Sequence, residues 1–244
     1  MNCNKILIAA MSGLLLAECT PKNNQQETAQ EVPAESNIHE FVWSADQALN
    51  GATIGQQGEM QVLNLGSNDG YYNLTAETGK LIQSLNDFTV SVYFKVDSIN
   101  QLDGYGHFLF AFSKLAENKA DEGPYMAMRL NEQRFETSTG GWEHEEIVMQ
   151  GGQPVRNVWI HALFRQAGKS GELFLDGQLI GHNDNMPILS EIFEEAPACC
   201  WIGRAPFNGD KYLTDTQVAD FRIYEYAVCD NELQQLLEKK QLLQ

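Results

Sequence analysis

The feature that most constrains the fold of this chain is the regular alternation of apolar and polar side chains in residues 87–96. One side of this stretch is wholly apolar, and it consists of Phe88, Val90, Val92, Phe94 and Val96. A period of two is that of a β-strand, because successive side chains leave opposite faces of the strand. The stretch therefore predicts a half-buried strand, and Tyr93 falls on its polar side.

Residues 159–180 repeat this alternation and interrupt it with turns. A strand pattern over 159–167 is followed by the turn sequence Gly168-Lys169-Ser170-Gly171, and a second strand pattern covers 172–175. Asp176-Gly177 then precedes a third short strand at 178–180. Asp-Gly supplies the positive backbone φ angles that a two-residue hairpin needs. The region is therefore predicted to be an antiparallel meander.

Similar strand patterns occupy residues 38–45, 61–65, 108–112, 125–130, 134–138 and 216–224. We expect no helices between them, and strands joined by short turns specify two antiparallel sheets packed face to face. The only helix that we expect is terminal. Asp230 can cap it, and Leu233, Leu236 and Leu237 form its apolar stripe.

Several motifs identify a family. The order is W-x-H at 159–161, G-x-L-x-L-D-G at 171–177, W-I-G-R at 201–204 and D-F-R-I-Y at 220–224. Together they resemble the laminin G-like, concanavalin A-like jelly-roll modules, and the resemblance extends from residue 38 to the C-terminus. It implies one all-β, two-sheet jelly-roll sandwich of the kind found in secreted carbohydrate-active proteins, although a fold does not fix a function. Within these motifs we interpret Trp159, Trp201 and Arg204 as packing residues.

The N-terminus is typical of bacterial export. A short charged start, an apolar run over 6–17 and Cys19 predict a signal peptide over 1–18 and a lipidated first residue at Cys19. Glu18 departs from the lipoprotein pattern, and simple secretion is the alternative. Residues 19–37 are predicted to be a disordered tether, and 38–244 the folded domain. We therefore expect an outer-membrane lipoprotein of the cell envelope, held to the membrane through its lipid.

The formal net charge of −17 limits the ligand classes. Nucleic acids require Lys and Arg to neutralise their phosphates, so a nucleic-acid partner is not expected. Acidic polysaccharides are disfavoured for the same reason. Neutral oligosaccharides or polysaccharides remain the natural ligands, while solubility alone is the other explanation of the charge.

Sugar binding calls for an aromatic ring that packs on the ring face of the sugar, with polar side chains that hydrogen-bond its hydroxyls. Trp142 follows two glycines in a polar loop and is our candidate for an exposed platform. Arg129 and Arg134 stand on either side of a predicted turn and would orient the sugar. Tyr125 and Tyr93 would share their sheet face if the strands are neighbours.

Catalysis is not predicted. A glycosidase needs two facing carboxylates, and no strand carries an E-x-D-x-x-E run or a similar one. The glutamates at 143–146 and 191–195 fall in predicted loops, where such clusters are usually only solvated. We therefore predict a non-catalytic carbohydrate-binding protein. The alternatives are an adhesion module that binds an envelope protein and a divergent glycosidase.

Two further expectations concern metal and disulfide chemistry. Calcium is possible, with ligands from the oxygen-rich clusters that contain Asp184 and Asp210. An exported chain also permits a disulfide between Cys229 and either Cys199 or Cys200, and the sequence does not decide between this bridge and reduced thiols.

Overall fold

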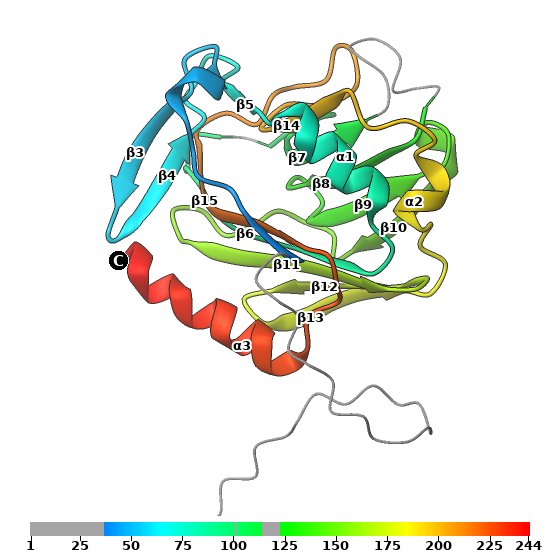
Figure 1. Ribbon diagram of the computed structural model, residues 1–244. Coiled ribbons are helices and arrows are strands. Elements are labelled where there is room, and N and C mark those ends of the chain that lie inside the picture. Colours follow the sequence, from blue (N-terminus) through cyan, green and yellow to red (C-terminus); the bar gives the residue numbers. More distant parts are fainter. Residues whose placement is uncertain (1–36, 101, 114–122) are drawn as a thin grey trace, which may run out of the picture. The chain divides into compact units, whose positions relative to one another are not determined.

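The computed structural model describes residues 37–100, 102–113 and 123–244, which form two antiparallel sheets packed face to face (Figure 1). The predicted signal peptide, Cys19 and nearly all of the predicted tether lie outside the described residues. Within the described ranges no helix has the length and apolar character needed to cross a membrane. The all-β sandwich predicted from the alternation patterns is confirmed.

The larger sheet, called sheet A, has the strand order β13-β12-β11-β6-β15-β4-β3, and β1 pairs with β15 beside this path. Its strands are β1 (Ile38–Glu40), β3 (Thr53–Gln57), β4 (Met60–Asn64), β6 (Phe88–Val96), β11 (Ile160–Ala167), β12 (Ser170–Leu175), β13 (Gln178–Asn183) and β15 (Thr216–Tyr224). The predicted meander is thus β11 to β13, with Asp176 at a φ of 47° and Gly177 at 76° in the tight turn.

The second sheet, called sheet B, has the order β10-β9-β8-β7-β14-β5-β2. Its strands are β2 (Ala48–Leu49), β5 (Tyr71–Asn73), β7 (Phe108–Ser113), β8 (Tyr125–Arg129), β9 (Arg134–Ser138), β10 (Glu145–Met149) and β14 (Cys199–Ile202). The short strands β2, β3 and β5 were not predicted, and β10 occupies the end of a segment predicted to be a loop. These short strands have no alternation pattern of their own, and they belong to the sheets because they pair with neighbouring strands.

The core lies between the two sheets and follows the predicted alternation. All five apolar residues of β6 belong to it, whereas Thr89, Ser91 and Tyr93 lie on the outer face of sheet A. Phe135 of β9 stacks on Phe164 of β11 with ring centroids 3.5 Å apart, which joins the sheets directly. Phe108 breaks the alternation of its strand, because a register shift between Phe108 and Phe110 turns its ring to the outer face of sheet B.

The expectation that the only helix is terminal is wrong. Helix α1 (Ala76–Ser84) precedes β6, and a short α2 (Leu189–Ile192) precedes β14; α1 and α2 contact each other beside the open edge of the sandwich (Figure 1). Short 3-10 helices lie at Ala45–Gln47, Trp142–His144 and Lys239–Leu243. Helix α1 has few apolar residues and a glycine at its centre, so it lacks a clear helical period.

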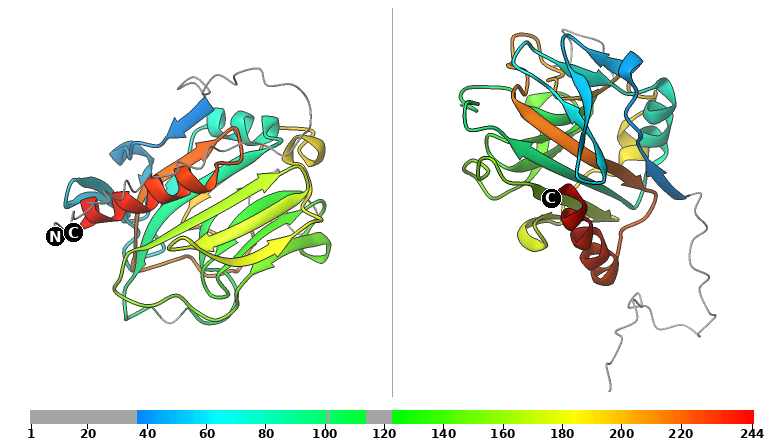
Figure 2. Two further views of the ribbon diagram at one scale, coloured as in Figure 1. Left: turned by 90° about the horizontal axis from the view of Figure 1, so that it is seen from below. Right: turned by 90° about the vertical axis from the view of Figure 1, so that its left-hand side faces the viewer.

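The C-terminal helix α3 (Asp230–Glu238) crosses the outer face of sheet A (Figure 2). Leu233 and Leu236 pack there with Leu163 and Phe174. Its N-cap is Cys229 and not Asp230, because the Glu232 carboxylate accepts from the Cys229 backbone N–H at 2.8 Å. Helix α3 therefore covers part of the outer face of sheet A, and the two side-chain clusters described next lie on sheet B.

Candidate functional site

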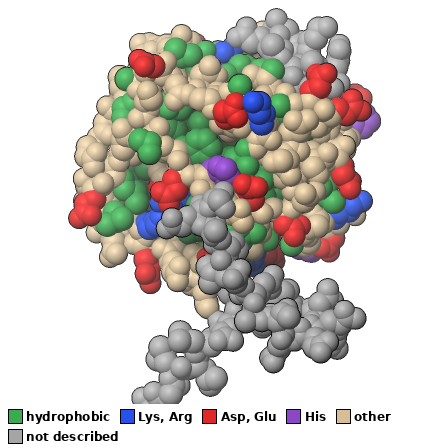
Figure 3. Space-filling model, viewed as in Figure 1, with side chains coloured by type: hydrophobic (Ala, Val, Ile, Leu, Met, Phe, Trp, Pro, Cys, Tyr) green, Lys and Arg blue, Asp and Glu red, His purple; other side chains and the backbone are tan. Residues whose placement is uncertain are grey.

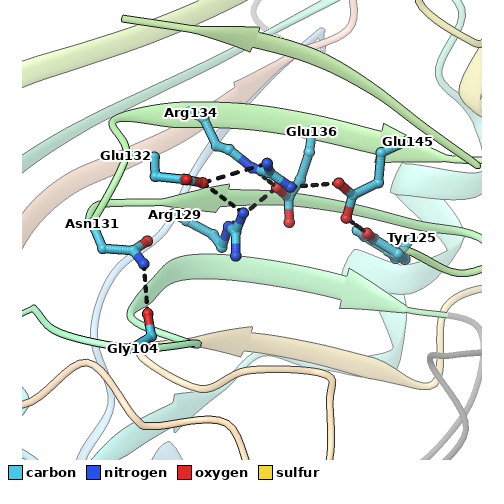
Figure 4. Close-up of polar contacts among 8 residues, drawn as sticks. All are labelled: Gly104, Tyr125, Arg129, Asn131, Glu132, Arg134, Glu136 and Glu145. Carbon is cyan, nitrogen blue, oxygen red and sulfur yellow. Dashed lines mark hydrogen bonds and ion pairs between the residues drawn. The ribbon is translucent and has the colours of Figure 1, made fainter. Parts of the chain in front are cut away.

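The outer face of sheet B carries a cluster of charged side chains, which we call the charged cluster: Tyr125, Arg129, Glu132, Arg134, Glu136 and Glu145 (Figure 4). Arg129 ends β8 and Arg134 begins β9, and the two residues pair directly across the hairpin. The hairpin turns at Gln133, whose φ of 47° closes it. The predicted approach of Arg129 to Arg134 is confirmed.

Both guanidinium groups are engaged by carboxylates. Arg129 Nη2 lies 2.7 Å from Glu132, and its Nε lies 3.3 Å from Glu136. Arg134 donates to Glu136 through Nε and to Glu145 through Nη2, the latter at 2.5 Å. The two side chains are only 12% and 11% exposed. Few of their N–H groups are therefore open to a ligand.

The sequence did not reveal that Glu136 and Glu145 meet. They lie on neighbouring strands, and Arg134 donates to both (Figure 4). Glu136 is fully buried, and this burial raises its pKa to about 7 although Arg134 and Arg129 lower it. The Tyr125 hydroxyl donates to Glu145, and burial raises the Tyr125 pKa above its ordinary value. Contrary to the prediction for this glutamate group, Glu145 is thus part of a strand and not a solvated loop residue.

Trp142 is exposed, as the glycines before it suggested, with 60% of its surface open to solvent. Gly141 has a φ of 82°, and its N–H donates to the Gly123 carbonyl at 2.9 Å. The loop joins the ends of β9 and β10 where Tyr125, Ser138 and Glu145 pair. Arg129 and Arg134 lie four residues away along the strands, about 13 Å. The Cα atoms of the arginines are therefore distant from the Trp142 loop, although Arg134 Nη2 reaches Glu145 at the start of β10 at 2.5 Å.

Tyr93 corrects the prediction of a shared face. Its strand, β6, belongs to sheet A, whereas Tyr125 and both arginines lie on sheet B. The Tyr93 side chain is wholly buried under the C-terminal segment and donates to the Leu236 carbonyl oxygen at 2.5 Å. The face of β6 on which Tyr93 lies was predicted correctly. The alternation within a strand, however, does not tell which of the two sheets that strand joins.

A second feature of sheet B is a small cavity beside β14, which we call the aromatic pocket. Its volume is about 90 Å³, and the residues that give it its character are Trp201, Arg204, Phe207, Asn208, Asp210 and Tyr212. The loop after β14 folds back over the sheet, and the Phe207 ring packs edge-on against Tyr125 at 5.2 Å between centroids. One wall of the pocket is therefore aromatic and the rim is polar.

Arg204 is held in place by three aromatic rings. Its guanidinium carbon lies 4.1 Å from the Trp201 ring centroid, 4.8 Å from that of Tyr71 and 5.5 Å from that of Tyr212. The attraction between a cation and a ring face is about 0.5–2 kcal/mol per contact, depending on exposure. Sequence reasoning interpreted Trp201 and Arg204 as packing residues only. No sequence signal places Tyr71 and Tyr212 beside them, because β5, the W-I-G-R segment and the loop that carries Tyr212 meet only in the folded structure.

The residues predicted as calcium ligands lie apart from one another. Asp184 is 68% exposed at its side chain and contacts His182 at 2.9 Å, while Asp210 borders the aromatic pocket. Among the described residues no group of three or more His, Cys, Asp or Glu side chains is arranged to hold a metal ion. Cys199 and Cys200 are buried and form no disulfide, so neither of them pairs with Cys229.

The surface outside these features carries scattered acidic side chains. On the face seen in Figure 3, Asp and Glu are distributed singly among polar residues, and Lys and Arg are fewer. A basic surface of the kind that binds nucleic acid is not visible on this face, in line with the net charge of −17.

Comparisons with known proteins agree with this fold. The family described as the concanavalin A-like lectin/glucanases superfamily matches residues 66–234. No curated protein gives a match by sequence. Among solved structures, domain 4 of AbnA, a GH43 extracellular arabinanase from Geobacillus stearothermophilus, solved in complex with arabinotriose, is 14% identical with a TM-score of 0.58. The match covers 76% of this chain and 81% of that domain.

Two toxin domains are also similar. The binding domain of Paraclostridial Mosquitocidal Protein 1 is 14% identical with a TM-score of 0.50, over 77% of this chain and 45% of that one. The botulinum neurotoxin serotype D ligand binding domain, solved in complex with N-acetylneuraminic acid, is 11% identical with a TM-score of 0.50. That match covers 78% of this chain and 44% of the toxin domain. This chain thus spans less than half the length of either, and identities this low show a common fold alone.

Proposed function

This chain belongs to the concanavalin A-like lectin/glucanases superfamily, and on that premise we propose that it is a non-catalytic carbohydrate-binding module. The proposed ligand is a neutral oligosaccharide or polysaccharide. The solved arabinanase domain of the same fold carries arabinotriose, so arabino-oligosaccharides are the first ligands to examine. The protein's strongly negative net charge favours a neutral ligand over an acidic one.

The observation that carries this proposal is the aromatic pocket. Tyr212 keeps part of its surface exposed to meet the apolar C–H face of a sugar, whereas the Trp201 ring is only 7% exposed and lies under the Arg204 guanidinium. Asn208 and Asp210 lie at the rim, where their side chains can exchange hydrogen bonds with sugar hydroxyls. Arg204 is fixed by its ring contacts, so little side-chain entropy is lost when it meets a ligand. The pocket therefore combines an aromatic surface at Tyr212 with preorganised polar groups.

Trp142 and the two arginines form the competing location. An indole that is 60% exposed suits a sugar platform, and Trp142 remains part of the proposed binding surface as a separate contact. Arg129 and Arg134 already donate to carboxylates, and a sugar hydroxyl is a weaker acceptor than a carboxylate. For this reason the aromatic pocket is the favoured principal site, and the arginine pair is assigned a supporting role in shaping the face.

A divergent glycosidase is the alternative suggested by Glu136 and Glu145. The raised pKa of Glu136 resembles that of a general acid, and a second carboxylate stands nearby. A glycosidase, however, must bring both carboxyl groups to the scissile bond. Glu136 has no exposed surface, so these carboxylates favour a structural role over catalysis.

The N-terminal sequence supports a proposal for the location of the protein. The proposal is a lipid anchor at Cys19 with a polar tether that holds the module away from the bacterial envelope, most simply at the outer membrane. An adhesion role, with an envelope protein as the partner, is the alternative for the same domain. Binding of glycans by the purified domain separates the two, because adhesion through a protein partner needs no sugar.

The test is isothermal titration of the domain with a panel of neutral plant and host oligosaccharides that includes arabinotriose. For the oligosaccharide that binds, Tyr212→Ala should weaken binding by about 1–3 kcal/mol, roughly ten- to a hundredfold in affinity. Asn208→Ala, at an exposed position in the pocket lining, is the second variant in case Tyr212→Ala unfolds. Leu179→Ala, on the edge strand of sheet A, is the matched control and should bind normally.

Trp142→Ala in the same titration decides between the two locations. If Trp142→Ala abolishes binding while both pocket variants bind as tightly as wild type, the site lies at the β9–β10 loop. If no oligosaccharide of the panel binds the wild-type domain, and release of reducing sugar is also absent, the carbohydrate-binding proposal is wrong and the adhesion alternative takes its place.

A further inference from the structure

One aromatic side chain outside the aromatic pocket stands out by its exposure and by the rigidity of its support. Tyr105 is 78% exposed, more than any other aromatic residue in the described part of the chain. It lies in the loop before β7, between Gly104 and Gly106, whose φ angles are 76° and 106°. Tyr105 thus points into solvent from a turn that glycine geometry creates.

The loop beneath Tyr105 is fixed at several points. The Lys211 backbone N–H donates to the Tyr105 carbonyl at 3.1 Å, and the His107 N–H donates to the Lys211 carbonyl at 3.0 Å. The Asn131 side-chain amide donates to the Gly104 carbonyl at 3.0 Å (Figure 4). Lys211 Nζ also lies 2.6 Å from the Asp103 carboxylate. An exposed ring on a loop fixed in this way loses little backbone entropy when it binds a ligand.

The close approach at Gly106 shows how tightly the two loops are joined. Gly106 forms a parallel β-bridge with Lys211, and a Cβ atom on Gly106 would lie 2.2 Å from the Lys211 carbonyl oxygen. This bridge joins the Tyr105 loop to the segment that carries Asp210 and Tyr212. From strand spacing and residue rise, the Cα atoms of Tyr105 and Tyr212 are roughly 8 Å apart.

A second cleft lies on this loop. Its volume is about 550 Å³, and Asn100, Asp103 and His107 form part of its lining. Gly209, Asp210 and Tyr212 line both this cleft and the aromatic pocket, so the two hollows adjoin the same segment. Tyr105 stands in the loop between two of the lining residues, Asp103 and His107.

We infer that Tyr105 is a second stacking subsite, and that the module binds an internal stretch of a glycan chain across the 208–212 segment instead of a single terminal sugar. This inference rests on the proposed carbohydrate binding at the aromatic pocket. One sugar unit occupies the pocket at Tyr212. Later units follow the cleft, where carboxylate side chains meet their hydroxyls, and one of them packs on the Tyr105 ring.

The experiment uses ladders of arabino-oligosaccharides and of cello-oligosaccharides, from the disaccharide to the hexasaccharide, titrated into the whole domain. For wild type, affinity should rise with chain length and then level off. Tyr105→Ala should remove that rise, a loss of roughly ten- to a hundredfold for the longer oligosaccharides, and leave disaccharide binding unchanged. Tyr105→Phe keeps the ring and should bind like wild type. Leu179→Ala is again the control.

The possible results separate this inference from the proposed function. If the pocket variant Tyr212→Ala weakens every oligosaccharide but wild-type affinity is independent of length, the pocket stands and the second subsite is refuted. Equal affinities of Tyr105→Ala and wild type along the whole ladder refute it as well. If neither oligosaccharide series binds the wild-type domain and no glycan of the neutral panel binds it, the proposed function is refuted together with this inference.

Discussion

Replacing Arg134 by Met should destabilise the protein in a way that depends strongly on pH. Arg134 donates to the buried Glu136 and to Glu145, and Met keeps much of its length without its charge. Burial raises the pKa of Glu136 to about 7 from an ordinary value of 4.5, and Arg134 is the first of the charges that lower it. Without Arg134, this pKa rises further, because the buried carboxylate has lost its strongest compensating charge.

The direction of the effect follows from proton linkage. A carboxyl group whose pKa is raised in the folded state binds its proton more tightly there than in the unfolded chain. In wild type, the contribution of Glu136 to the free energy of unfolding therefore falls as the pH rises from about 4.5 to 7, and is constant above. In Arg134→Met the fall continues above pH 7, by up to about 1.4 kcal/mol per pH unit.

The magnitudes at defined pH values follow from this slope. At pH 6 Glu136 is protonated in both folded proteins, so its part of the difference is close to zero. At pH 8 the variant should lose roughly 1–2 kcal/mol more than wild type, and at pH 9 roughly 2–3 kcal/mol. The lost contacts to Glu132 and Glu145 add a further cost, which the measurement at pH 6 records on its own.

Urea denaturation of both proteins at pH 6, 8 and 9 measures these differences. Lys80→Met is the matched control, because the Lys80–Glu77 pair is 66% and 78% exposed and should contribute little at any of these pH values. In the double variant Arg134→Met/Glu136→Gln the titrating group is absent, so the pH-dependent part should vanish. A destabilisation by Arg134→Met that is the same at pH 6 and pH 9 would refute the assignment to Glu136.

Three further predictions concern other parts of the chain. Tyr93→Phe removes the hydroxyl that donates to the Leu236 carbonyl oxygen, and it should lower the free energy of unfolding by about 1 kcal/mol in urea denaturation. Glycan binding should be unchanged, and reduced binding would place Tyr93 in the binding site. Burial lowers the pKa of His161 to about 3, so its ring should stay neutral in an NMR titration from pH 8 to pH 5, and protonation near pH 6 would contradict its burial. Cys19→Ala should abolish labelling by a fatty-acid analogue in the native host, and equal labelling of both proteins would exclude the anchor.

The sandwich could be predicted from the sequence because alternation in long strands is a local property. The local sequence alone defines an apolar face in residues 87–96 and in residues 216–224. Both segments form strands whose bounds lie within one residue of the prediction. The hairpin between Arg129 and Arg134 was predictable for the same reason, since it joins two adjacent strands.

The composition of the site could not be predicted in this way. Tyr93 and Tyr125 both lie on the face of their strand that points away from the core. Pairing between strands distant in sequence nevertheless places them on different sheets. Glu136 and Glu145 meet because β9 and β10 pair, and the glutamates at 143–146 resemble a solvated loop until that pairing is known. Tyr71, Trp201, Arg204 and Tyr212 come together through β5, β14 and a return loop, none of which has a periodic signal.

We assign the charged cluster of sheet B a role in stability, and we propose that the aromatic pocket serves recognition. In the charged cluster each cation is matched by carboxylates from the protein, and a group that is already paired gains little by exchanging its partner for a neutral hydroxyl. The aromatic pocket differs, because Tyr212 keeps part of its surface exposed although Arg204 packs over both Tyr212 and Trp201. Under the proposed function, binding energy is expected to arise chiefly at Tyr212 and Tyr105, while the cluster beneath Phe207 keeps the sheet that positions them rigid.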